Sequence, residues 1–177
     1  GIEQDAEAVR LFAQSGLSFF VSSSFSKSFS LYGERVGALS IVTGSKDEGS
    51  RVLSQAKRVI RTNYSNPPTH GATVVASVLN SPELRALWEE ELGEMRQRIR
   101  DMRLAMVEQL AAFGAKRDFS FVARQRGMFS YSGLTAEQVE RLKNEFGIYA
   151  VSTGRICVAA LNNGNLESVT RAITQVL

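Results

Sequence analysis

A long amphipathic pattern between residues 82 and 114 limits how this chain can fold. Apolar side chains recur there at spacings of three and four, the period of one helix face: Leu84, Trp88, Leu92, Met95, Ile99, Met102, Met106 and Leu110. The helix has a strong start, because Ser81 offers a capping hydroxyl and Pro82 takes the first helical position. At 1.5 Å per residue it would be roughly 45–50 Å long, so we expect it to connect two packed bodies.

The charges of this helix are segregated along its length. Acidic residues come first, at Glu83, Glu89, Glu90, Glu91 and Glu94, and basic residues follow, at Arg96, Arg98, Arg100 and Arg103. This order suits the helix dipole. We interpret the charged residues as a solvated helix face; the alternative is an arginine stripe that binds nucleic acid.

Shorter helices and strands are predicted on both sides of the long helix. Before it, helices are predicted over 3–14, from 45 to the stop at 66–68, and over 71–79, with strands at 17–21 and 38–42. Both strands could be buried, and the serine-rich segment 22–37 between them is predicted to be a loop. After it, we predict strands at 119–122, 128–131, 148–151 and 155–160, a helix from Thr135 to Gly147, and a final helix over 166–176. The predicted fold is α/β followed by α+β.

The composition excludes several classes of protein. With 177 residues, 44% hydrophobic and 22% charged, the chain is globular rather than disordered. A balance of 21 Lys+Arg against 18 Asp+Glu favours neither nucleic acid nor a membrane as partner. Cys157 is the single cysteine, so no internal disulfide can form, and a reducing, cytoplasmic location fits. No apolar run approaches the ~18 residues that span a bilayer. The start at Gly1 resembles neither a signal peptide nor a natural initiation, which indicates an internal cut.

The most unusual local feature is Lys27, which lies among serines at positions 22, 23, 24, 26, 28 and 30, with Arg35 eight residues later. Hydroxyls and a guanidinium suit a phosphate group, because the hydroxyls donate and the guanidinium binds two oxygens. A lysine among them can neutralise the phosphate or, as a free amine, attack a carbonyl. The competing interpretation is an exposed lysine in a flexible loop.

The sequence lacks the residues that other kinds of catalytic or metal site require. A nucleotide-binding P-loop requires glycines where Ser26 and Val21 stand. The only histidine, His70, lies in a Pro-Pro-Thr-His-Gly turn where a structural role is expected, so a catalytic triad is excluded. Cys157 lies in an apolar strand pattern and is expected in the core. No metal site is predicted, because thiolate, imidazole and clustered aspartate ligands are missing.

Four segments together resemble the aspartate aminotransferase family, fold-type I enzymes that depend on pyridoxal 5'-phosphate. The segments are 24–37, 61–68, 125–130 and 152–159, in the same order and separations along the whole chain. The resemblance implies the carboxy-terminal part of the large α/β domain over 1–95 and the α+β small domain over 96–177. The family's chain is more than twice as long, so we expect this piece alone to be inactive.

The resemblance also implies roles for particular residues. Lys27 corresponds to the lysine that forms the internal aldimine and later moves the proton. Ser24 and Arg35 correspond to phosphate ligands, and Ser26 is a weaker candidate. Arg155 corresponds to the arginine that binds the substrate α-carboxylate.

Four further positions match the surroundings of the substrate. Arg61 matches the arginine that reaches the neighbouring subunit's site to bind a dicarboxylic side chain, which implies a homodimer. Phe129 matches an aromatic wall of the pocket, and Tyr32 and Asn66 match positions near the site.

The implied reaction moves an amino group from an aromatic or dicarboxylic L-amino acid to 2-oxoglutarate. Ser28, Ser30 and Gly33 resemble bacterial tyrosine aminotransferases, whereas Asn66 favours an aspartate-preferring enzyme. Two alternatives of other kinds remain: a non-catalytic helical interaction module built on residues 82–114, and another pyridoxal enzyme, such as a lyase, on the same scaffold.

Overall fold

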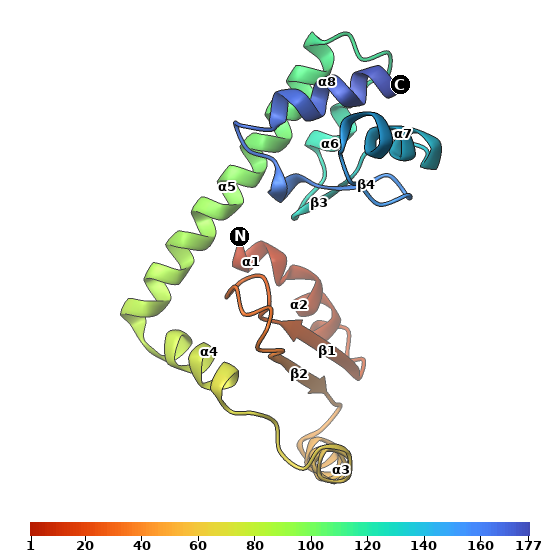
Figure 1. Ribbon diagram of the computed structural model, residues 1–177. Helices are drawn as coiled ribbons and strands as arrows, with labels where there is room; N and C mark the ends of the chain where they lie inside the picture. The colour runs from red at the N-terminus through yellow and green to blue at the C-terminus, as the bar shows by residue number, and fades with distance from the viewer. The chain divides into compact units, whose positions relative to one another are not determined.

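The computed structural model describes all 177 residues, and the chain separates into two compact units, Gly1–Leu92 and Gly93–Leu177 (Figure 1). The boundary between the units falls within the long helix α5. No helix has both the length and the apolar character needed to cross a membrane. In chain order the elements are α1 (Ile2–Asp5), α2 (Glu7–Gln14), β1 (Phe19–Ser24), β2 (Gly37–Val42), α3 (Lys46–Asn63), α4 (His70–Asn80), α5 (Pro82–Ala112), α6 (Ser120–Ala123), β3 (Phe129–Tyr131), α7 (Ala136–Phe146), β4 (Arg155–Cys157), the 3₁₀ turn η1 (Val158–Ala160) and α8 (Leu166–Val176).

The first unit is organised by an antiparallel pair of strands. β1 pairs with β2 from Phe19↔Val42 to Ser24↔Gly37. The first strand therefore starts and ends later than predicted, and the loop begins at Phe25 rather than at residue 22. The predicted helix over 3–14 is divided at Ala6 into α1 and α2, although Ala6 keeps a right-handed helical backbone at φ −81° and ψ −6°.

The expectation that both strands could be buried is wrong within this chain. Along β1, half-buried Phe19 and Val21 alternate with exposed Phe20, which is 72% accessible. On β2, Leu39 is 61% accessible. The centre of the Phe12 ring, from α2, lies 5.6 Å from the centre of the Phe19 ring. An apolar strand pattern predicts extended backbone, but burial depends on which elements pack over the strand.

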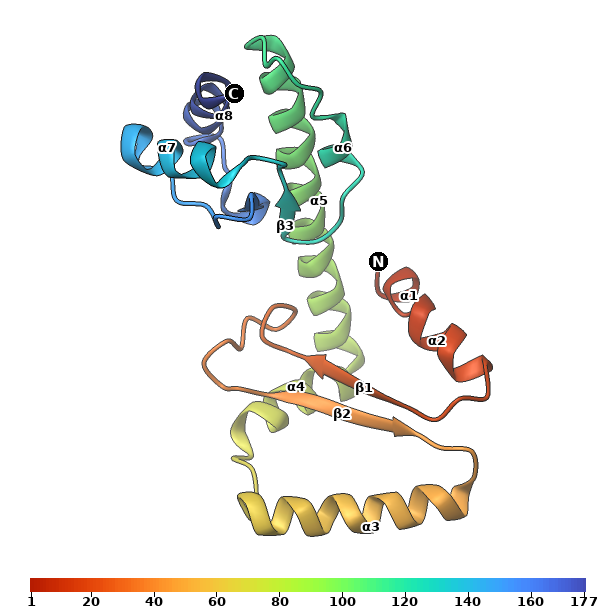
Figure 2. The same ribbon diagram turned by 90° about the vertical axis from the view of Figure 1, so that its right-hand side faces the viewer.

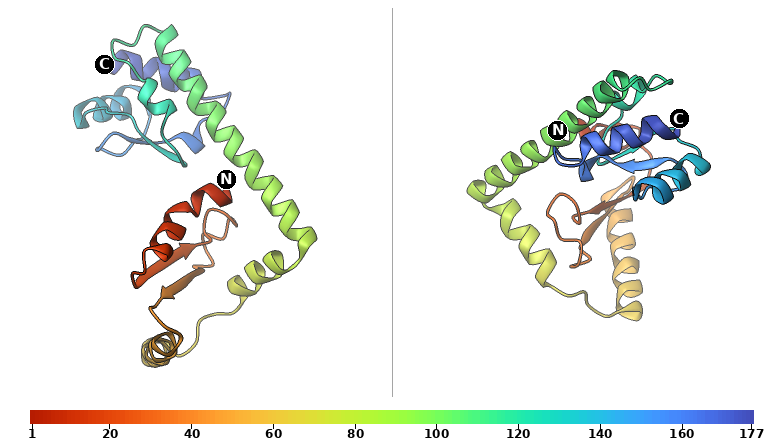
Figure 3. Two further views of the ribbon diagram at one scale, coloured as in Figure 1. Left: turned by 180° about the vertical axis from the view of Figure 1, so that it is seen from behind. Right: turned by 45° about the horizontal axis from the view of Figure 1, so that its top comes forward.

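The second unit has the chain's continuous hydrophobic core, which the C-terminal part of α5 shares with α7 and α8. Thr170 of α8 donates a hydrogen bond to Gln109 of α5 at 2.9 Å, and Figure 3 shows the two helices side by side. The buried apolar residues are Met106, Leu110, Phe119, Val122, Leu134, Val139, Leu142, Val158, Leu161, Leu166, Ala172, Ile173 and Val176. The solvated-face interpretation is wrong for Arg103, which is 5% exposed.

The helices with strong end signals form as predicted. The Ser81 hydroxyl accepts a hydrogen bond from the Leu84 amide at 3.3 Å at the start of α5. At α7, Thr135 and Gln138 form a reciprocal capping box, and Gly147 ends the helix in the left-handed region at φ 65°. Each of these signals satisfies backbone groups that a helix end would leave unpaired.

Three predicted strands of the second unit differ from the structure. Residues 119–122 fall mostly in the short helix α6, because the Asp118 carboxylate accepts hydrogen bonds from the amide and hydroxyl of Ser120 and so starts a turn. Residues 148–151 form no strand, although the Val151 amide donates to the Arg155 carbonyl at 3.2 Å. The strand predicted over 155–160 ends at Cys157 and continues as the turn η1.

Replacing Leu110 by alanine should destabilise the second unit strongly. Leu110 is fully buried in the core, so Leu110→Ala should lower the free energy of unfolding by about 2–5 kcal/mol, measured by urea denaturation. Leu104→Ala on the same helix is the matched control, because Leu104 is 46% exposed, and its effect should stay within about 0.5 kcal/mol. Equal effects of the two substitutions would contradict this assignment of the core.

Candidate functional site

Lys27 lies in a single helical turn directly after β1. The Phe29 amide donates to the Phe25 carbonyl and the Ser30 amide donates to the Lys27 carbonyl, each at 3.2 Å. The loop that carries this turn is closed at its base, where the Phe25 amide donates to the Val36 carbonyl at 3.2 Å. Figure 2 shows this loop joining β1 to β2. Strand pairing therefore brings the two ends of the Lys27 loop together.

The polar groups predicted to bind phosphate lie close in sequence to the hydrogen bond between Phe25 and Val36 that closes this loop. Ser26 is 4% exposed, and its amide donates to the Ser24 hydroxyl oxygen at 3.2 Å, which leaves the Ser24 proton free to donate elsewhere. Arg35 has a left-handed backbone at φ 52° and donates to the Tyr32 carbonyl at 2.9 Å. The Lys27 ammonium nitrogen lies 5.1 Å from the centre of the Tyr32 ring. Ser24, Ser26, Lys27, Tyr32 and Arg35 are thus brought together by one loop.

An aromatic cluster supports the Lys27 turn, and sequence reasoning missed its role. Trp88 of α5 stacks on Phe29 with ring centres 4.7 Å apart, and Phe29 meets Phe25 edge-to-face at 5.5 Å. The Trp88 indole N–H donates to the Ser28 carbonyl at 2.7 Å. These contacts fix the residues on both sides of Lys27. The helical spacing of Trp88 predicted a core position without indicating which turn it supports.

Arg61 and Asn66 lie away from this loop, at and beyond the end of α3. The Arg61 guanidinium donates to the Ser65 hydroxyl, and the backbone amide of Asn66 donates to the Tyr64 carbonyl at 2.8 Å. Both side chains are exposed, and no hydrogen bond or ion pair joins them to the Lys27 turn. Within this chain the structure therefore does not bring Arg61 and Asn66 into contact with Lys27.

In the second unit, the pairing of β3 with β4 places Arg155 beside Phe129. Phe129 pairs with Cys157 and Tyr131 pairs with Arg155, so Phe129 and Arg155 are diagonal neighbours across the ladder. The Arg155 guanidinium carbon lies 4.9 Å from the centre of the Phe129 ring, a cation–π distance. Both side chains remain open to solvent, with Phe129 44% accessible. Cys157 lies on β4, as its apolar pattern predicted, but it is only half-buried and outside the hydrophobic core, so the expected core position is wrong.

Gly154 and Ser132 set the position of Arg155. The Gly154 carbonyl accepts hydrogen bonds from the Ser132 amide at 2.9 Å and from its hydroxyl at 2.6 Å. Gly154 has φ 82°, and a Cβ there would lie 2.6 Å from the Leu134 carbonyl oxygen. Only glycine fits this position, so the residue before Arg155 is fixed by sterics as well as by hydrogen bonds. The Ser-Thr-Gly-Arg sequence indicated a turn but not this close approach.

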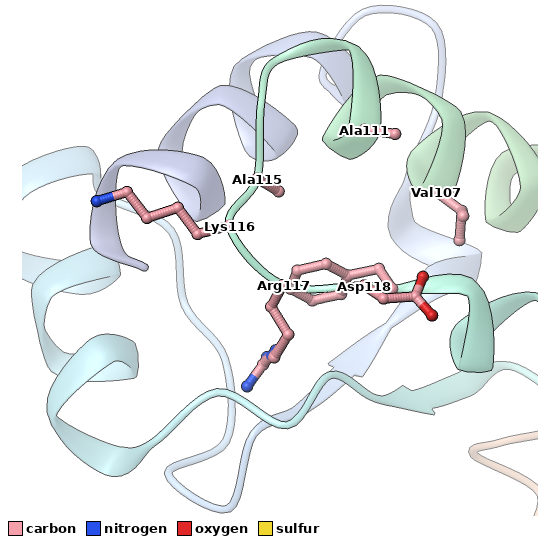
Figure 4. Close-up of a pocket in the computed structure, with 7 residues that line it drawn as sticks. Val107, Ala111, Ala115, Lys116, Arg117 and Asp118 are labelled. Carbon is pink, nitrogen blue, oxygen red and sulfur yellow. The ribbon is translucent and has the colours of Figure 1, made fainter.

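A separate hollow of about 270 Å³ in the second unit contains none of the predicted site residues (Figure 4). Arg117, on its wall, donates to the carbonyls of Gly133 and Ser132 at 2.8 and 2.7 Å. Asp118 accepts from Ser120, and these hydrogen bonds lower the pKa of its carboxyl. Arg117 and Asp118 are therefore used to hold neighbouring segments. The full lining is Val107, Ala111, Ala115, Lys116, Arg117, Asp118 and Phe119.

The predicted cationic residues are not neutralised within the chain. Lys27, Arg35, Arg61 and Arg155 form none of its ion pairs, which involve Arg10, Arg85, Arg141, Lys143 and Arg171. In the first unit, two serine hydroxyls, a guanidinium and an amine on one loop form a donor set that fits a phosphate-bearing aldehyde such as pyridoxal 5'-phosphate. In the second unit, Arg155 on an aromatic face fits a carboxylate.

Comparison with known proteins identifies the family. The family described as aminotransferase class I and II matches residues 1–173. The chain belongs to this aminotransferase family. It is 88% identical over 177 residues to the aspartate aminotransferase of Pseudomonas aeruginosa and 50% identical over 177 residues to the aromatic-amino-acid aminotransferase of Escherichia coli. Each match includes 100% of this chain, but only 44% of the Pseudomonas aeruginosa enzyme and 45% of the Escherichia coli enzyme.

A solved aminotransferase structure has the same fold. The aromatic-amino-acid aminotransferase of Burkholderia pseudomallei, covalently bound to pyridoxal phosphate, is 73% identical with a TM-score of 0.97, over 100% of this chain and 44% of that one. This likeness confirms the predicted α/β fold class, that of the fold-type I aminotransferases. The chain spans less than half the length of the aminotransferases it matches.

Replacing Gly154 should disturb the aminotransferase chain more than replacing another left-handed glycine. Gly147→Ala tests the backbone conformation alone, because φ is 65° and no atom lies within 4 Å of the added Cβ; it should lower the free energy of unfolding by about 1–2 kcal/mol. Gly154→Ala adds the clash with Leu134 and should lose more. Thermal unfolding of both variants checks this, and equal losses would show that the close approach is unimportant.

Proposed function

We propose that the full-length protein containing this chain is a pyridoxal 5'-phosphate-dependent aminotransferase. Its donor would be an aromatic or dicarboxylic L-amino acid and its acceptor 2-oxoglutarate. The observation that carries the proposal is the loop, closed at its base by strand pairing, that carries Ser24, Ser26, Lys27 and Arg35. Membership of the aminotransferase family supports an enzyme over a non-catalytic helical module.

In this proposal the first unit holds the cofactor. Lys27 would hold its aldehyde carbon, and the hydroxyls of Ser24 and Ser26 with the guanidinium of Arg35 would bind its phosphate oxygens. When bound, the cofactor supplies an electron sink that makes the substrate Cα–H bond acidic. The Lys27 amine would then take the proton from Cα and return it as general acid. Tyr32, whose ring lies 5.1 Å from the Lys27 nitrogen, would restrict that amine's motion.

The second unit would bind the substrate's α-carboxylate. Arg155 can donate two parallel hydrogen bonds to a carboxylate, and the Phe129 ring behind the guanidinium limits its orientation. Arg61 would bind the side-chain carboxylate of a dicarboxylic substrate in the neighbouring subunit of a homodimer, with Asn66 near that site. We place residues 1–95 in the carboxy-terminal part of the large cofactor domain and 96–177 in the small domain.

The proposal includes the cell compartment and the state of this piece. We expect the enzyme to be cytoplasmic, because a chain with a single cysteine, Cys157, fits a reducing compartment. We expect the 177-residue piece alone to be inactive, because it covers only 44% of its 88% identical relative. A transamination rate from this piece would contradict that expectation.

A second candidate is an enzyme that prefers aspartate. The relative that is 88% identical is named an aspartate aminotransferase, whereas the structure that is 73% identical is named an aromatic-amino-acid aminotransferase. Assays of the full-length protein with tyrosine, phenylalanine and aspartate against 2-oxoglutarate decide between these preferences.

Lys27 should be the residue that borohydride labels. In the full-length protein loaded with pyridoxal 5'-phosphate, reduction and peptide mapping should place the label on Lys27. Lys27→Ala should lose the label and at least about 10³-fold of kcat, because the covalent anchor and the proton carrier are both removed. Lys57→Ala, an exposed lysine on α3, is the control and should keep both. Label on another lysine would contradict the role proposed for Lys27.

Arg61 and Arg155 should separate the two ends of a dicarboxylic substrate. Arg155→Lys should raise KM about tenfold or more for both tyrosine and aspartate, because an ammonium cannot bind the α-carboxylate in a bidentate way. Arg61→Met should raise KM for aspartate only, since tyrosine has no side-chain carboxylate. Steady-state kinetics with both substrates measures this. An equal effect of Arg61→Met on tyrosine would contradict its proposed role.

A further inference from the structure

We propose that Arg103 is a positioning residue that holds strand β3 in place, so that Phe129 presents its ring to the guanidinium of Arg155. This inference rests on the proposed function of Arg155 as the carboxylate-binding residue. All the contacts that carry it lie within the second unit.

Arg103 comes from α5 and reaches the segment that leads into β3. Its Nε donates to the Ser130 hydroxyl at 3.2 Å, and its Nη2 donates to the Gly127 carbonyl at 2.6 Å and to the Phe129 carbonyl at a longer 3.5 Å. The acceptors are on consecutive parts of one short segment (β3 lies beside α5 in Figure 2). One planar guanidinium therefore fixes both the entry and the body of the strand.

The burial of this arginine is unusual because no carboxylate neutralises it. Arg103 is 5% exposed and Ser130 is 1% exposed, yet the guanidinium meets only carbonyl and hydroxyl oxygens. Burial and then the charge of Arg126 lower the pKa of Arg103. A buried charge without an ionic partner is unfavourable unless hydrogen bonds compensate for its lost hydration. Here all of these hydrogen bonds go to the Gly127–Ser130 segment that carries Phe129.

Arg103 supports the beginning of β3, near Phe129, whereas other contacts hold the rest of the strand. One edge of the strand pairs with β4. At the other edge the Gln125 side chain accepts from the Tyr131 amide at 2.7 Å and donates to the Tyr131 carbonyl at 2.9 Å. Gln125 thus holds the end of the strand, whereas Arg103 holds its beginning together with the Ala159 amide, which donates to the Met128 carbonyl at 3.2 Å. A shift of the Gly127–Ser130 backbone would move the Phe129 ring, whose centre lies 4.9 Å from the Arg155 guanidinium.

The test uses the full-length protein and three variants. Arg103→Met keeps the length of the side chain but removes every donor, Arg103→Lys keeps a charge that cannot span three acceptors, and Ser130→Ala removes one acceptor. Arg141→Met is the control, because Arg141 lies on α7 of the same unit and its guanidinium donates to the Glu145 carboxylate at 2.7 Å, not to the β3 segment. Thermal unfolding identifies which variants fold.

The expected result is a loss of carboxylate binding at nearly constant turnover. In folded Arg103→Met, KM for tyrosine and aspartate and the Kd of the unreactive dicarboxylate succinate, measured by calorimetry, should rise about ten- to a hundredfold. The kcat should change far less, which separates binding from chemistry. Arg103→Lys and Ser130→Ala should give smaller rises, and Arg141→Met should give none.

Each outcome either supports or overturns the positioning role of Arg103. Wild-type KM and succinate Kd in the folded Arg103 variants would overturn the positioning role. If Arg103→Met does not fold, unchanged values in Arg103→Lys and Ser130→Ala would overturn it equally, as would the same rise in Arg141→Met. Failure of the wild-type protein to transaminate, with succinate binding that depends on Arg103, would instead overturn the proposed function and support the positioning role.

Discussion

Antiparallel pairing of two short strands is the constraint on which each unit's candidate residues depend. In the first unit, pairing from Phe19↔Val42 to Ser24↔Gly37 closes the loop that carries Lys27. In the second, pairing of Tyr131 with Arg155 places the guanidinium diagonally across from Phe129. Such ladders are short, and a two-stranded ribbon is marginal by itself. Neighbouring side chains therefore have to hold the strands: Trp88 beside the first loop, and Arg103 with Gln125 around the second pair.

Features encoded over a few residues were predictable from the sequence. Helices α5 and α7 begin at capping residues and show clear apolar periods, so both were predicted to within a few residues. The strands were harder, because a short apolar alternation is compatible with other structures. The Phe119–Val122 segment alternates like a strand, but the Asp118 carboxylate caps a turn, and the packing of Val122 in the core is satisfied by a helix as well. The exposure of Phe20 and Leu39 depends on neighbours that no local pattern encodes.

In the candidate site, too, the local features were predictable and the contacts between distant segments were not. Lys27 and its serines stand out in the sequence, and their loop lies between two strands as predicted. The residues that hold the site were missed, because their contacts join segments far apart: Arg103 lies 27 residues from Ser130, and Trp88 lies 60 from Ser28. One signal was present for Arg103. It follows Ile99 by four residues and precedes Met106 by three, so the helical period puts it on the apolar face.

The stacking of Trp88 on Phe29 makes the turn optically observable. Trp88 is the only tryptophan among the 177 residues, and its indole N–H is bonded to the carbonyl of Ser28, the residue after Lys27. Indole emission responds to changes in hydrogen bonding and in the contact of the ring with its neighbours. The chain therefore has an intrinsic fluorophore in direct contact with the turn that bears Lys27.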